Sequence, residues 1–180
     1  MEFTFEFLDS RRILMLHGER PPPAARWTEY LQQLESRNVS SLGLLVFTNG
    51  GAPDPAQRHE LNRVLSGRYF ARAIVHRSAV VRGVVAAVGW FAPGVAAFRP
   101  DCWHAAAAHA GVAEGELERV ARAVRRLHAS MSVQIPWLEE ALAGGESPPS
   151  VVMARSTSRP TARPSLSTPR VTIPKAGAGL

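Results

Sequence analysis

A short apolar run that ends in a glycine pair and leads into a helix signal constrains the fold most strongly. It reads LGLLVFTNGG and covers residues 42–51. Such a continuous apolar run is typical of a strand that is covered on both faces of a parallel sheet. Asp54 is then a suitable N-cap and Pro55 a suitable first helical residue. The predicted helix carries Ala56, Leu61, Val64 and Leu65 at helical spacing. Because ligands and partners of open α/β sheets gather at the carboxyl ends of strands, the loop between strand and helix is the first place to look for function.

The composition is that of an ordinary globular domain. The chain has 180 residues, of which 46% are hydrophobic and 20% charged, so one domain with a sizeable core is expected. No apolar run approaches the roughly 18 residues that a membrane span needs. The first ten residues, MEFTFEFLDS, carry acids where a signal peptide carries bases, which predicts a cytoplasmic protein without a membrane span. The single cysteine, Cys102, agrees with a reducing compartment.

The positive charge is concentrated near the C-terminus. The formal charge is +6, and residues 151–180 hold five bases and no acid, whereas the first 150 residues hold 16 bases and 15 acids. A nucleic-acid-binding domain needs a basic face on the fold itself. Nucleic acid is therefore not an expected partner, except through the basic tail.

The N-terminal part alternates like a hairpin and then becomes helical. Residues 2–8 alternate phenylalanine with polar residues, which predicts a strand with one exposed face, and residues 13–16 predict a second strand that pairs antiparallel with it. Three prolines, at 21–23, end the pairing. The helix predicted over residues 24–36 carries one apolar stripe, formed by Trp27, Tyr30, Leu31 and Leu34.

Two further strand and helix pairs are expected after residue 65. Residues 69–76 alternate as a strand, and Ser78 is a suitable N-cap for the next helix. Gly83 and Gly89 favour close packing of that helix on the sheet. Its apolar residues are Val80, Val81, Val84, Val85, Val88 and Phe91. A strand over 95–98 precedes a helix that Asp101 caps and Gly111 ends.

The C-terminal third predicts helices and then a tail. Residues 114–130 form an amphipathic helix whose apolar stripe either covers the core or serves a partner or a second copy of the chain. A short helical piece is expected within 135–143. From residue 144 onward proline, serine, threonine, arginine and glycine dominate, which predicts a disordered tail.

The element order resembles a known family. The expected order is a hairpin, a helix and three strands that are each followed by a helix. Over Phe3 to Val112 this order resembles the STAS superfamily. The segments that carry the resemblance are LGLLVFTNGG, ARAIVHRSAVVRGVVAAVGWF and VAAFRPDCWHAAAAHAGV. The likeness is to proteins similar to anti-sigma-factor antagonists, which are also grouped with CRAL-TRIO lipid-binding domains. The predicted fold class is α/β: an antiparallel hairpin leading into a mostly parallel sheet with helices packed on it. We divide the chain into a STAS-like domain (1–112), a helical extension (113–143) and the tail (144–180).

The resemblance implies a regulatory, non-enzymatic module that binds another protein. In switching members of the family, a serine or threonine is phosphorylated after a central strand, and here Thr48 is the hydroxyl in that loop, although the family's paired serines are absent. A phosphate near a helix N-terminus is physically favourable. The residues predicted to meet a partner are Thr48, Asn49, Gly50, Gly51, Asp54, Arg58 and His59.

Other chemistries fit the sequence poorly. Cys102 and His104 are two residues apart and face different sides of a helix, so Cys102 is interpreted as a buried structural cysteine. His104 and His109 miss the i, i+4 spacing of a metal pair, and His59 with Glu60 has no nearby nucleophile. No cofactor, metal site or enzymatic activity is expected. The alternative to the interaction module is a small-ligand or lipid carrier of CRAL-TRIO type, with a pocket lined by Phe47, Val84, Val88 and Phe91.

Overall fold

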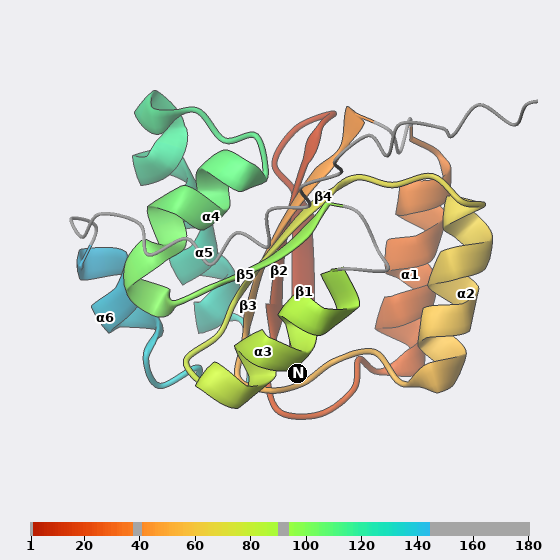
Figure 1. Cartoon of the computed structure of the whole chain (residues 1–180), viewed down its shortest axis with the longest axis horizontal. Helices are drawn as coiled ribbons and strands as arrows, with labels where there is room; N and C mark the ends of the chain where they lie inside the picture. Colours follow the sequence, from red (N-terminus) through yellow and green to blue (C-terminus); the bar gives the residue numbers. More distant parts are fainter. Residues whose placement is uncertain (1, 38–40, 90–93, 145–180) are drawn as a thin grey trace, which may run out of the picture.

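The computed structural model describes residues 2–37, 41–89 and 94–144, and these form a five-stranded sheet with helices on both faces (Figure 1). The strands are β1 (Phe3–Phe7), β2 (Arg12–His17), β3 (Gly43–Thr48), β4 (Ala71–Val75) and β5 (Val95–Phe98). They lie side by side in chain order; β1 and β2 are antiparallel, and all later pairs are parallel. The predicted α/β class and the opening hairpin are confirmed. β3 is an interior strand with every residue buried, as its apolar run predicts.

The helices divide between the two faces of the sheet. They are α1 (Ala24–Glu35), α2 (Pro55–Leu65), α3 (Ala79–Gly89), α4 (Trp103–His109), α5 (Leu117–Ala129) and α6 (Leu138–Ala143). Figure 1 shows α1 and α2 on one side of the sheet and α4, α5 and α6 on the other. None of the helices in the described ranges has both the length and the apolar character needed to cross a membrane.

Alternate residues of the central strands feed two separate hydrophobic cores. Leu45 and Phe47 point to the core beneath α4, α5 and α6, whereas Leu44 and Val46 point to the core beneath α1 and α2. This follows from the period of two along a strand. Residues of α5 and α6 belong to the same core as β2, β3 and β4, so the predicted helical extension packs directly on the sheet. The predicted tail lies outside the described residues, apart from Gly144.

The start of α2 is fixed by reciprocal side-chain bonds. The Asp54 carboxylate accepts the Gln57 backbone N–H at 2.9 Å, and the Gln57 side-chain oxygen accepts the Asp54 backbone N–H at 3.0 Å. This capping box confirms Asp54 as the N-cap. The predicted apolar stripe was wrong at one position: Ala56 is exposed, and Gln57 is buried because its amide also donates to the Pro22 carbonyl at 2.7 Å.

The close packing predicted for α3 on the sheet is confirmed at Gly89 and was wrong for the earlier part of the helix. Val80 and Val84 are 78% and 61% exposed, and a Cβ added at Gly83 would meet nothing within 4 Å. Only Gly89 approaches the sheet, where an added Cβ would lie 2.9 Å from the Val95 carbonyl oxygen. α3 therefore rests on the edge strand β5 and leaves space over the central strands.

The predicted cap at Asp101 was also wrong. Asp101 lies within a 3-10 turn, Pro100–Cys102, that precedes α4, and its carboxylate pairs with Arg99 instead of with a backbone N–H of α4. Gly111 ends this region with a φ of +78°, as predicted. The apolar stripe of α5 is buried on the sheet as predicted.

Candidate functional site

A pocket lies between the sheet and the helices α1, α2 and α3. Its volume is about 630 Å³, within the range of small-molecule binding sites. We call it the sheet pocket. Its apolar walls include Met15, Leu44, Val46, Leu61, Val81, Val85 and Val95. It exists because α3 rests on β5 while α2 packs beside α1, so that the strands between these helices are only partly covered.

The mouth of the pocket also carries exposed apolar side chains. Tyr69 is 53% exposed and Val84 is 61% exposed, and both line the pocket. Exposed apolar side chains are unremarkable singly, but here they adjoin a concave apolar wall. The apolar surface therefore runs from the interior of the pocket to its rim.

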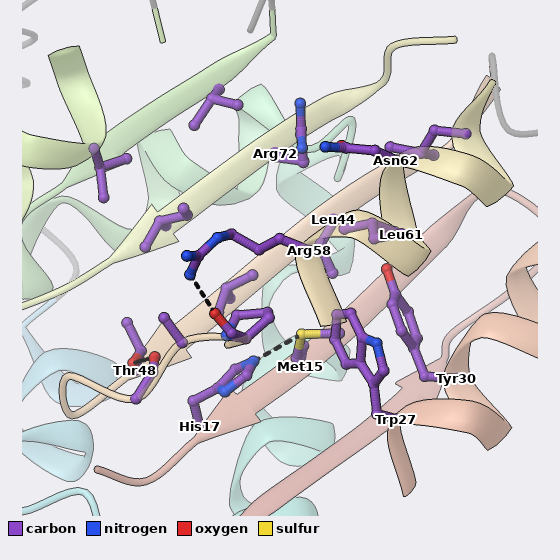
Figure 2. Close-up of a pocket in the computed structure, with 18 of the residues that line it drawn as sticks. Met15, His17, Trp27, Tyr30, Leu44, Thr48, Arg58, Leu61, Asn62 and Arg72 are labelled. Atoms are coloured by element: carbon purple, nitrogen blue, oxygen red, sulfur yellow. Dashed lines mark hydrogen bonds between the residues drawn. The ribbon is translucent and has the colours of Figure 1, made fainter. Parts of the chain in front are cut away.

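Four polar atoms around the sheet pocket are buried and have no hydrogen-bond partner among the described residues. They are His17 Nδ1, Trp27 Nε1, Tyr30 Oη and Arg72 Nε, and all four residues line the pocket. Figure 2 shows Arg72 toward the top of the view, and His17 and Trp27 toward the bottom. A buried polar atom without a partner costs about 1–3 kcal/mol, so such atoms are rare in folded proteins. Eight such atoms occur among the described residues, and the other four belong to residues outside the pocket lining. The four at the pocket mark where polar groups of a ligand would find partners.

His17 is neutral in the fold. Its side chain is 2% exposed, and burial lowers its pKa to about 4. Its Nε2 lies 3.2 Å from the sulfur of Met15, and its ring is 4.7 Å from that of Phe3, centroid to centroid. No carboxylate is within ion-pairing distance in the described structure, so nothing compensates a proton on the ring.

We expect stability to fall as the pH drops from 6.5 toward 4, because the unfolded chain binds the His17 proton before the folded chain does. The stability that neutral His17 contributes is present above pH 6.5, and about 2.5 kcal/mol of it is lost by pH 4.5. Burial lowers the pKa values of His76 and His128 in the same direction, so the total loss is larger. Urea unfolding at pH 7 and at pH 4.5 measures this loss. Between the two pH values, the free energy of unfolding should fall less in His17→Gln than in the wild type, and the difference should equal about the loss assigned to His17.

The matched control is His59→Gln on α2, because His59 is exposed. Between the two pH values, the free energy of unfolding of His59→Gln should fall by as much as that of the wild type. An unchanged pH dependence in His17→Gln would contradict the assignment of His17 as a buried neutral group.

The charged groups of the sheet pocket are all cations. Arg58, Arg68 and Arg72 line it, and no aspartate or glutamate is among the described lining residues. Arg58 donates to the Pro53 carbonyl, and Arg68 donates to the carbonyls of Leu65 and Val64 at the end of α2. The side chain of Arg72 makes no hydrogen bond or ion pair with any described residue.

The loop after β3 is closed on itself. Thr48 is 4% exposed, and its hydroxyl donates to the Gly51 carbonyl at 2.8 Å and accepts the Gly50 N–H at 3.1 Å. Gly50 has a φ of +116°, and Asn49 donates to Glu19 at 3.0 Å. Phosphorylation of Thr48 stays a prediction; in this conformation a kinase would first have to open the turn.

The predicted partner-binding residues separate into two groups. Thr48, Gly50, Gly51 and Arg58 line the sheet pocket, whereas Asn49, Asp54 and His59 do not. His59 points outward on α2, and Asp54 is occupied by the capping box. Their role in binding a protein stays a prediction.

The pocket predicted from the sequence was partly wrong. Val84 lines the sheet pocket, but Phe47 is fully buried in the core on the opposite face of the sheet. Phe91 and the side chain of Val88 lie outside the described residues. Sequence reasoning missed His17, Trp27, Tyr30 and Arg72 as site residues. The available signals were an arginine within the apolar strand segment 71–75 and a histidine at the end of the apolar segment 13–16.

The remaining candidates do not form a second site in the described parts of the chain. Cys102 is 8% exposed, as predicted, and its sulfur lies 3.6 Å from the Asp101 carboxylate. The ring of His104 packs on Trp103, and His109 lies 3.0 Å from the Gly94 carbonyl oxygen. Within residues 2–37, 41–89 and 94–144, no three His, Cys, Asp or Glu side chains gather closely enough to hold a metal ion.

No protein-family model matches the chain, and neither does any curated protein or solved structure. The resemblance to STAS domains therefore stays a prediction that rests on element order and apolar pattern.

Proposed function

We propose that this protein binds a small, mostly apolar ligand in the sheet pocket. The observation that carries the proposal is a pocket of about 630 Å³ whose lining includes four residues that each hold a buried, unpartnered polar atom. An apolar cavity with a few convergent polar groups is the usual form of a small-molecule site. The proposal keeps the ligand carrier that the sequence offered as the alternative function. It places the pocket on the face of the sheet beneath α1 and α2 instead of beside Phe47.

The polar groups at the pocket favour binding without a chemical reaction. The Thr48 hydroxyl is already hydrogen-bonded within the turn that follows β3. The ring of His17 has no hydrogen bond to a nucleophile or a carboxylate among the described residues. General acid–base or nucleophilic catalysis requires such a pair within hydrogen-bond reach. Accordingly, the proposed role is that of a carrier or a ligand sensor.

Filling the pocket should abolish binding. We expect Val85→Trp on α3 to reduce the affinity for the apolar dye Nile red at least tenfold, because the indole would occupy the space beside Leu61 and Val46. Fluorescence titration measures the affinity, and native mass spectrometry of freshly purified protein would reveal a ligand that co-purifies.

The matched control is Val80→Trp on the same helix. Val80 is 78% exposed and does not line the sheet pocket, so this variant should bind the dye as the wild type does. Equal dye binding by the wild type, Val80→Trp and Val85→Trp would overturn the proposed site.

A second candidate function is the protein-interaction module of STAS type. It is supported by the exposure of Arg58 and His59 on α2, the helix that follows the loop after β3, and by the exposure of Val80 on α3. The module predicts a partner whose recovery in a pull-down depends on residues 48–62. It also predicts that Val85→Trp leaves this recovery unchanged, which separates it from the ligand carrier.

A further inference from the structure

Arg72 is a cation placed among apolar groups. It lies on β4, where it pairs with Leu44 of β3, and its face of the sheet is the one that lines the sheet pocket. Its guanidinium carbon lies 5.4 Å from the centre of the Phe70 ring, and its Nε is buried without a partner. Burial also lowers the pKa of Arg72, because the surroundings disfavour the charge. A guanidinium remains charged in proteins, so the fold holds a positive charge that no described carboxylate neutralises.

Tyr30 supplies a second unused donor near this charge. Its side chain is 1% exposed and its hydroxyl has no partner among the described residues. Burial raises the pKa of Tyr30, and the positive charge of Arg72 opposes that rise. A neutral phenol donates one hydrogen bond, and the guanidinium donates up to five. Because Tyr30 and Arg72 both line the sheet pocket, both groups are placed to donate to a ligand bound there.

We infer that the ligand of the sheet pocket is an amphiphile with a carboxylate head, held by Arg72 and Tyr30, and a hydrocarbon body. This inference rests on the proposed function. A carboxylate oxygen accepts from both donors and neutralises the half-buried charge of Arg72. The hydrocarbon body lies along Leu44, Val46 and Met15 toward His17. The strand register gives its length.

Arg72 pairs with Leu44, whereas His17 pairs with Thr48, four residues further along β3. At about 3.3 Å per residue along a strand, the Arg72–Leu44 pair and the His17–Thr48 pair are roughly 13 Å apart in the strand direction. An extended chain of about ten carbons matches this distance, so decanoic acid is a suitable probe. Its methyl ester has the same hydrocarbon body without the charge and serves as the reference ligand.

The test measures the affinity of both probes at pH 7 by competition with Nile red. In the wild type the acid should bind at least about 10-fold more tightly than the ester, as expected for hydrogen bonds to charged groups. In Arg72→Met, which keeps an apolar side chain of similar length, this preference should disappear while the ester binds as before. Tyr30→Phe should lower the affinity for the acid several-fold and leave the affinity for the ester unchanged. Arg63→Met, an exposed position on α2 outside the pocket lining, is the control and should retain the preference.

A stability measurement separates this role from a structural one. Without ligand, Arg72→Met should unfold at higher urea concentration than the wild type, because a half-buried charge without an ion-pair partner has been removed. If the acid and the ester bind equally in the wild type, the carboxylate inference fails and the apolar site stands. If neither probe displaces the dye and the dye itself does not bind, the proposed function fails. A lower urea midpoint in Arg72→Met, with the acid preference intact, would assign Arg72 a structural role and overturn the inference.

Discussion

Gly43→Ala is expected to destabilise the fold by about 3 kcal/mol or more, because the new methyl group has no space. Gly43 opens β3, and its N–H donates to the Arg11 carbonyl at 2.7 Å. A Cβ at this position would lie 2.0 Å from the carbonyl oxygen of Ala110 and 2.7 Å from its carbonyl carbon. Both are backbone atoms, so relief requires the segment after α4 to move away from the sheet. Urea unfolding followed by tryptophan fluorescence measures the change.

Gly83→Ala is the matched control and should have the opposite sign. Gly83 lies within α3, and an added Cβ would meet nothing within 4 Å. Alanine in a helix interior is favoured over glycine by about 0.5–1 kcal/mol, so this variant should be slightly more stable than the wild type. Equal stability of Gly43→Ala and the wild type would show that α4 does not approach β3 as described.

Phe47→Ala should cost about 3–5 kcal/mol and leave ligand binding intact. Phe47 is fully buried, and its ring centre lies 6.4 Å from that of Trp137 in the core beneath α4, α5 and α6. Removing the ring leaves an enclosed cavity on the face of the sheet away from the pocket. Under conditions where the variant is folded, its affinity for Nile red should equal that of the wild type.

Val46→Ala, one residue away on the same strand, should show the reverse combination. Val46 lines the sheet pocket, so its truncation enlarges an existing space and costs about 1 kcal/mol. The dye affinity should change, because the wall that it contacts has changed. If Phe47→Ala loses dye binding while Val46→Ala retains it, the pocket lies on the other face of the sheet.

Local signals predicted much of the chain. The apolar run over 42–47 and the alternation over 2–8 identify strands, because burial on a pleated sheet repeats every two residues. Asp54 and Pro55 identify the start of α2, since capping involves only residues within one turn. Where such signals failed, a side-chain contact that the pattern does not encode decided the outcome. Gln57 is buried because its amide reaches Pro22, and Asp101 pairs with Arg99 instead of capping α4.

The amino-acid sequence by itself determined the α/β class, the element order and the interior position of β3, because periodicity and capping are encoded by near neighbours. Only the tertiary structure decided where the candidate site lies. The spacing of α3 from the sheet depends on its contact with β5, whereas Gly83 and Gly89 in the sequence predicted close packing. The pocket then joins Tyr30 of α1 to Arg72 of β4, residues 42 positions apart in the chain. Their lack of partners is a property of the assembled fold, because burial is set by segments that are distant in sequence.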